Sequence, residues 1–133
     1  MLFTRFYKMN PLLGMAVEEA FYEFSRTVSN YDGGAWEVVV DSDDVCAVYP
    51  VSSGSLEVGH DGNYVLPIEI SSRAFGVYVS LAVYNKLCWL FHDQGNNALC
   101  EVFSSMYHSL RIWMIDTTEL PPAEVEHILR MID

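Results

Sequence analysis

Residues 74–91 read Ala-Phe-Gly-Val-Tyr-Val-Ser-Leu-Ala-Val-Tyr-Asn-Lys-Leu-Cys-Trp-Leu-Phe, the longest apolar stretch of the chain. Valine, tyrosine and phenylalanine favour a strand, but 18 residues are too many for a typical strand, so the length favours a helix. Because apolar residues cover most of its circumference, this helix is expected at the centre of the core. Ser80, Asn85 and Lys86 interrupt the stretch, which falls short of the uninterrupted apolar length of a membrane helix.

Another helix is predicted near the N-terminus, after a short extended start. Asn10 can cap it, and Pro11 suits its first position because a missing N–H costs nothing there. Apolar residues recur every three or four positions from Leu13 to Val28, and the helix is expected to end near Ser29.

Four short β-rich runs lie between these two helices, separated by turn-forming residues. This texture is typical of an antiparallel meander and not of a crossover unit. The predicted strands are Trp36–Val40, Val45–Tyr49, Leu56–Val58 and Tyr64–Ile70.

Two further helices are predicted after the central one. Apolar residues from Leu99 to Trp113 follow the 3.6-residue period, and Pro121-Pro122 can open a last helix that carries Glu124 in its first turn. The sequence therefore predicts a single α+β domain over residues 1–133, a four-stranded antiparallel meander packed with an N-terminal helix and three C-terminal helices.

The charge excludes several classes of function. The 133 residues carry 18 acids and 7 bases, a formal charge of −11, which is the wrong sign for binding nucleic-acid phosphates through a basic patch. The two lysines, Lys8 and Lys86, follow no glycine-rich loop, so a phosphate-binding P-loop is absent. We therefore expect no direct contact with nucleic acid.

The cysteines indicate the compartment. Cys46, Cys88 and Cys100 form an odd set without a C-x-x-C pair, which fits a reducing, intracellular environment. The first residues lack the basic start, apolar stretch and cleavage site of a secretory signal. We expect a soluble cytoplasmic protein that does not contact a membrane.

Candidate catalytic and metal-binding patterns are weak. Cys88 and His92 lie four positions apart on the central helix, but two ligands do not make a metal site, and core packing explains them better. Asp41-x-Asp43-Asp44 resembles the opening of a calcium loop, yet Cys46 and Ser52 occupy positions that need glycine and glutamate. We predict no catalytic residue, cofactor or metal.

The segment Tyr31-Asp-Gly-Gly-Ala-Trp-Glu37 is more informative. Two glycines before a large aromatic let the chain turn sharply and place Trp36 at the start of a strand, so the segment is interpreted as an architectural hinge. The alternative is a partner-binding surface centred on Tyr31 and Trp36, since tyrosine and tryptophan dominate interface hot spots.

This segment resembles the Tyr-x-Gly-Gly-x-Trp-(Glu/Asp) signature of the ArdB/KlcA family of antirestriction proteins. Residues 118–122, Thr-Glu-Leu-Pro-Pro, depart from the family's common His-Pro-Glu turn. Further stretches similar to the family are Asp61-Gly62-Asn63-Tyr64, Ser71-Ser72-Arg73-Ala74-Phe75-Gly76, His108-Ser109-Leu110-Arg111 and the C-terminal helix ending Ile132-Asp133.

The resemblance implies an accessory protein of plasmids, prophages or other mobile elements that relieves type I DNA restriction in the cell. The family has no assigned catalytic residues, so none is carried over. The partner that the resemblance implies is a type I restriction enzyme or a host factor that controls it.

DNA mimicry by the acidic residues is not expected. A compact chain of this size is roughly 36 Å across, and duplex DNA of that length carries about 21 phosphates. The 18 acids are scattered by the helical periodicity and diluted by 7 bases.

We therefore expect a noncatalytic protein that acts by protein–protein contact, with its acidic field assisting the encounter. The alternatives are a small cytoplasmic thiol or metal enzyme that uses Cys88 and His92, an acidic interaction module, and a stability or assembly module whose aromatic surface pairs with itself. The residues predicted to contribute to a partner surface are Tyr31, Trp36, Asp41, Asp43, Asp44, Glu119, Glu124, Glu126 and Asp133.

Overall fold

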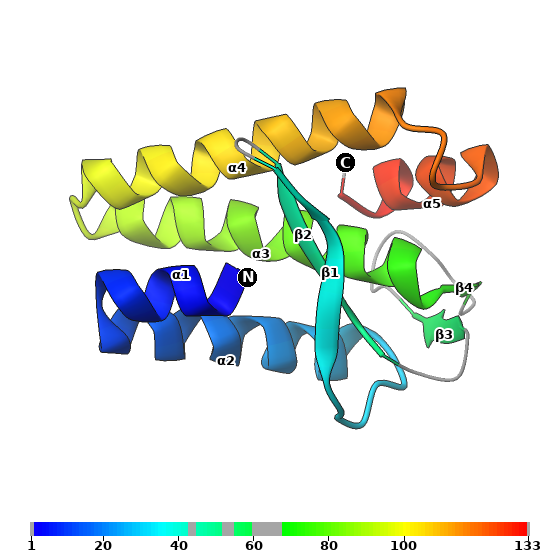
Figure 1. Ribbon diagram of the computed structural model, residues 1–133, viewed down its shortest axis with the longest axis horizontal. Helices are drawn as coiled ribbons and strands as arrows, with labels where there is room; N and C mark the ends of the chain where they lie inside the picture. Colours follow the sequence, from blue (N-terminus) through cyan, green and yellow to red (C-terminus); the bar gives the residue numbers. More distant parts are fainter. Residues whose placement is uncertain (1, 43–44, 52–54, 60–67, 133) are drawn as a thin grey trace.

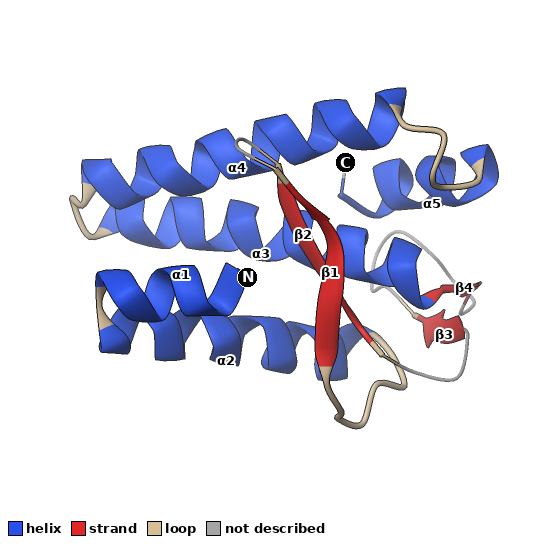
Figure 2. Ribbon diagram, viewed as in Figure 1, coloured by secondary structure: helices blue, strands red, loops and turns tan. Residues whose placement is uncertain are grey.

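The computed structural model describes residues 2–42, 45–51, 55–59 and 68–132. In these ranges five helices and four strands form one α+β arrangement (Figures 1 and 2). In chain order the elements are α1 (Leu2–Met9), α2 (Pro11–Val28), β1 (Trp36–Asp41), β2 (Cys46–Pro50), β3 (Ser55–Val58), β4 (Ile68–Ser71), α3 (Ser72–Asp93), α4 (Asn97–Asp116) and α5 (Pro122–Ile132).

Helix α3 is the central element, as the sequence predicts. Figure 1 shows α4 along one side of α3, the α1–α2 hairpin along the other, and the β1–β2 hairpin crossing it. Ser71 caps the helix, accepting a hydrogen bond from the Ala74 N–H at 3.2 Å. By length and composition α3 could cross a membrane, but 61% of its most apolar window is buried inside the protein. These contacts identify it as a core helix.

One face of α3 is built to receive strand β2. A Cβ atom at Gly76 would overlap the Tyr49 Cβ atom and the Val48 carbonyl oxygen, so glycine allows the two backbones to touch. One and two turns further along, the buried Ser80 hydroxyl lies 3.4 Å from the Val48 nitrogen, and the Tyr84 hydroxyl donates to the Cys46 carbonyl oxygen at 2.7 Å. The stripe Gly76–Ser80–Tyr84 therefore holds β2 against the helix.

The extended start expected before Asn10 is wrong, because residues 2–9 form helix α1. An eight-residue helix is marginal by itself and offers too few turns for a periodic signal. It is stabilised by packing, since the Phe3 ring meets Phe21 edge-on at 5.2 Å and the Phe6 ring stacks on Phe103 at 5.1 Å. The Asn10 cap and the end of α2 near Ser29 are confirmed.

The four-stranded meander is also wrong. Strands β1 and β2 form one antiparallel pair, and β3 and β4 form a second, separate pair. The free edge of β3 is taken by the chain that leaves α2, because the Asn30 N–H donates to the Glu57 carbonyl and the Gly59 N–H donates to the Val28 carbonyl. Of the predicted strand Tyr64–Ile70, residues 68–70 belong to β4 and residues 64–67 lie outside the described part of the chain.

We predict that Gly76→Ala lowers the free energy of unfolding by about 1–3 kcal/mol, the usual cost of overpacking a core. In an unhindered helix the same change would stabilise the protein by about 1 kcal/mol, so the sign distinguishes the two cases. Urea unfolding measures it, with the exposed Ser105→Ala as a control that should change stability by no more than about 0.5 kcal/mol. A more stable Gly76→Ala protein would contradict the close contact between α3 and β2.

Candidate functional site

The hinge predicted at residues 31–37 is present between α2 and β1. Gly33 and Gly34 adopt φ values of +128° and +118°, which side chains with a Cβ rarely tolerate. The turn brings the Trp36 indole N–H to the Tyr31 hydroxyl, to which it donates at 3.0 Å. The signature residues therefore form one folded unit.

The two hinge aromatics belong to the core. The exposed fractions of Tyr31 and Trp36 are 6% and 7%, and the Trp36 ring packs edge-on against Phe21 at 5.7 Å. Their burial supports the interpretation as an architectural hinge, since in the free chain these rings offer little area to a partner. The side chain of Glu37, which follows Trp36, is exposed.

Four carboxylates from β1, β4, the α4–α5 connection and α5 lie near the start of α3. We call these residues, Glu37, Glu69, Glu119 and Glu124, the acidic surface. Figure 1 shows β4 and α5 beside the end at which α3 begins, and the β1–β2 hairpin crossing the helix. Side-chain contacts run from Glu37 through Tyr49 and Arg73 to Glu119. Ser55 and Ser71, which are paired across the β3–β4 ladder, contact Glu69 and Glu124.

Glu124 ties the start of α5 to the start of α3. Its carboxylate accepts hydrogen bonds from the Ser71 N–H at 2.6 Å and from the Ser71 hydroxyl at 3.0 Å. Ser71 is the N-cap of α3, and Glu124 lies in the first turn of α5. One negative charge therefore lies beside the positive ends of two helix dipoles, where it is stabilising.

Arg73 is the cation at the centre of the acidic surface. Its guanidinium is 3.4 Å from the Glu119 carboxylate and lies 5.8 Å from the centre of the Tyr49 ring. The Tyr49 hydroxyl in turn donates to Glu37 at 3.2 Å. One guanidinium against four carboxylates leaves three uncompensated negative charges within the set.

Glu69 completes the acidic surface from strand β4. Its carboxylate accepts a hydrogen bond from the Ser55 hydroxyl at 3.0 Å, and Ser55 pairs with Ser71 across the β3–β4 ladder. The side chains of Glu37, Glu69 and Glu119 are exposed, whereas that of Glu124 is half-buried. Three of the four carboxylates can therefore reach another molecule.

The structure brings together only part of the predicted acidic set. Glu119 and Glu124 belong to the acidic surface, whereas Glu126 pairs with Arg130 at 2.7 Å on α5, where both side chains are more than 60% exposed. Asp41 lies at the opposite end of β1 from Glu37. Asp43, Asp44 and Asp133, and the segment Asp61–Tyr64, lie outside the described residues.

Sequence reasoning missed Glu37, Glu69 and Arg73 as members of this surface. No spacing along the chain signals their proximity, because strand pairing and helix packing bring them together. The one available signal was the acidic last position of the hinge signature, which is Glu37.

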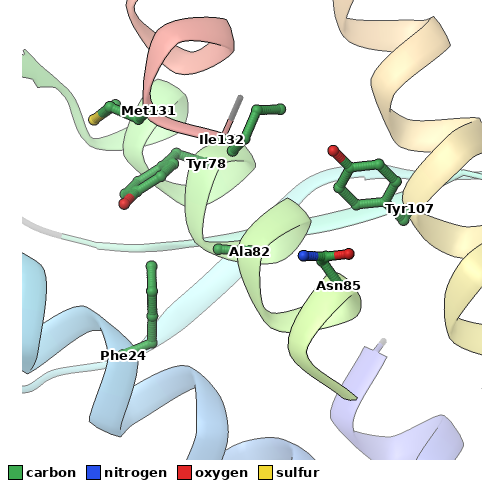
Figure 3. Close-up of a pocket in the computed structure, with 7 residues that line it drawn as sticks. All are labelled: Phe24, Tyr78, Ala82, Asn85, Tyr107, Met131 and Ile132. Carbon is green, nitrogen blue, oxygen red and sulfur yellow. The ribbon is translucent and has the colours of Figure 1, made fainter. Parts of the chain in front are cut away.

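A pocket of about 220 Å³ opens between α2, α3, α4 and the end of α5. Its polar groups are the Asn85 amide and two tyrosine hydroxyls, and burial raises the pKa of Tyr78 well above its ordinary value. Among the described residues that line it, none carries a carboxylate, an imidazole or a thiol. Figure 3 shows the lining residues Phe24, Tyr78, Ala82, Asn85, Tyr107, Met131 and Ile132.

The alternative site at Cys88 and His92 is divided between two environments. The Cys88 sulfur lies 3.5 Å from the Cys100 sulfur, and the His92 ring packs edge-on against Trp89 at 5.5 Å. In the part of the chain that the structure describes, no three His, Cys, Asp or Glu side chains gather to hold a metal ion.

Comparison with known proteins identifies one relationship. The family model described as antirestriction protein matches residues 29–133. This range includes the hinge and every residue of the acidic surface. A search of curated proteins found no match to the chain.

We predict that Glu124→Gln lowers the free energy of unfolding by about 1–2 kcal/mol, because it removes the charge from two hydrogen bonds at a half-buried site. Glu126→Gln, two positions further along α5, removes an exposed pair and should cost no more than about 0.5 kcal/mol. Urea unfolding of both variants tests the difference. Equal losses would show that Glu124 does not link α5 to α3.

Proposed function

The chain belongs to the ArdB/KlcA family of antirestriction proteins, and we propose on this premise that it relieves type I DNA restriction by contact with another protein, without a catalytic step. The observation that carries the proposal is the span of the family match. Residues 29–133 include the hinge and all of the acidic surface, so the features that we use lie within the family's own domain.

The acidic surface supports contact with a protein. Its carboxylates come from β1, β4, the α4–α5 connection and α5, and side-chain hydrogen bonds hold several of them in place. A preorganised group of negative charges steers a basic partner surface and fixes its orientation on contact. The partner that we propose is a type I restriction enzyme or a host factor that controls it, met in the cytoplasm.

The distribution of charge argues against imitation of DNA. Duplex DNA across a chain of this size would present about 21 phosphates, more than the 18 acids of the whole chain. The acids also point in several directions, because Glu19 and Glu23 are exposed on α2 and Glu101 on α4, away from the acidic surface. A monomer therefore lacks the density of a duplex backbone.

The fold also supports a role as a contact surface. The described residues that line the pocket in Figure 3 are aromatic and aliphatic side chains and an amide, and among them is neither a nucleophile with its base nor a metal site. The buried hinge and the close contact of α3 with β2 give a rigid support on which a contact surface can be presented.

We predict that the triple variant Glu37→Gln, Glu69→Gln and Glu119→Gln weakens protection against restriction. If the acidic surface contributes about 1.4 kcal/mol to partner binding, the affinity for the partner falls about tenfold and protection falls with it. The measurement is the plating efficiency of unmodified phage on cells that express a type I restriction enzyme and equal amounts of each variant.

The matched control neutralises three exposed glutamates elsewhere, as Glu19→Gln, Glu23→Gln and Glu101→Gln. It changes the net charge by the same amount and should retain protection. Urea unfolding checks that both triple variants are folded. Equal protection by the two variants would remove the acidic surface from the mechanism, and loss of protection only with the first variant would support it.

A further inference from the structure

Two of the three cysteines meet between α3 and α4. Cys88 lies near the end of α3, and Cys100 lies in the first turn of α4. The two helices run antiparallel and are joined by the short connection 94–96 (Figure 1). The two sulfur atoms are 3.5 Å apart and both cysteines are free thiols.

The thiol pair is open to small molecules. Both side chains are half-buried, and Cys88 lines a surface pocket of about 170 Å³. The other lining residues are Asn85, Trp89, Ser104, Tyr107 and His108. The pocket exceeds the roughly 30 Å³ that a water molecule takes up in the liquid, so a molecule as small as hydrogen peroxide can reach the Cys88 sulfur.

We propose that Cys88 and Cys100 form a reversible dithiol–disulfide site that hydrogen peroxide oxidises and a cellular thiol reduces. This inference does not depend on the proposed function, because it rests on the geometry of α3 and α4 alone. Intracellular disulfides of this kind are transient and sense redox conditions, in contrast to the permanent cross-links of secreted proteins.

The chemistry balances in two steps. One thiolate attacks peroxide, the O–O bond breaks, and the sulfur becomes a sulfenic acid while hydroxide leaves. The second thiol then attacks that sulfur, the S–S bond forms, and water leaves. Two thiols and one peroxide therefore give one disulfide and two waters, and two equivalents of a reducing thiol reverse the change.

The geometry allows the bond to form with little movement. A disulfide places its sulfurs about 2.0 Å apart, so the two atoms must approach by about 1.5 Å. We expect rotation of the two side chains about their Cα–Cβ bonds to supply this shift. Burial and the neighbouring Cys100 raise the pKa of Cys88, so oxidation should be faster at pH 9 than at pH 7, because the thiolate is the reacting form.

Cys46 provides an internal control within the same chain. Its side chain is 6% exposed and lies on β2, and burial raises its pKa to about 11. A buried thiol with so little thiolate at neutral pH should remain unmodified under conditions that oxidise the pair.

The test is oxidation of the purified, fully reduced chain with hydrogen peroxide and, separately, with buffers of oxidised and reduced glutathione. We expect the thiol titre to fall from three to one per chain and the intact mass to fall by two hydrogens. Peptide mapping should find Cys88 joined to Cys100, and dithiothreitol should restore all three thiols.

Cysteine variants test which of the three thiols form the disulfide. Cys46→Ser should still lose both remaining thiols, whereas Cys88→Ser and Cys100→Ser should form no internal disulfide. An unchanged titre in oxidising glutathione buffer, a stable glutathione adduct on one cysteine, or a linkage through Cys46 would overturn the proposal.

Discussion

The close contact between α3 and β2 organises the rest of this molecule. Gly76, Ser80 and Tyr84 follow one another at four-residue intervals and so lie on one face of α3. The glycine lets the strand backbone approach, and the two hydroxyl groups lie against polar backbone atoms of β2. Because a buried polar group is costly without a partner, these contacts specify the position of the strand as well as its depth.

The position of the acidic surface follows from this placement. Strand β2 carries Tyr49 to the guanidinium of Arg73 at the start of α3, and its partner β1 brings Glu37 to the Tyr49 hydroxyl. The hinge before β1 fixes where that strand begins, since Trp36 is anchored by Tyr31 and Phe21. The aromatic signature therefore contributes to the surface indirectly, by positioning the exposed glutamate that follows it.

The acidic residues divide into two kinds once their partners are known. Glu124 is half-buried and serves two helix N-termini, so its charge contributes to the fold. Glu37, Glu69 and Glu119 are exposed at the same end of α3 and are available to a partner. Net charge alone cannot distinguish the two kinds of carboxylate. The distinction depends on which carboxylates the packed helices and strands enclose.

Local patterns in the sequence were sufficient for the Asn10 cap, helices α2 to α5 and the hinge, because capping, periodicity and positive φ act between residues close together in the chain. Tertiary structure alone decided four features. These are helix α1, the division of the strands into two pairs, the position of the acidic surface, and the contact between Cys88 and Cys100. Each depends on contacts between distant residues. Helix α1 is short and is stabilised by packing against Phe21 and Phe103, and residues 28–30 form hydrogen bonds to the outer edge of β3.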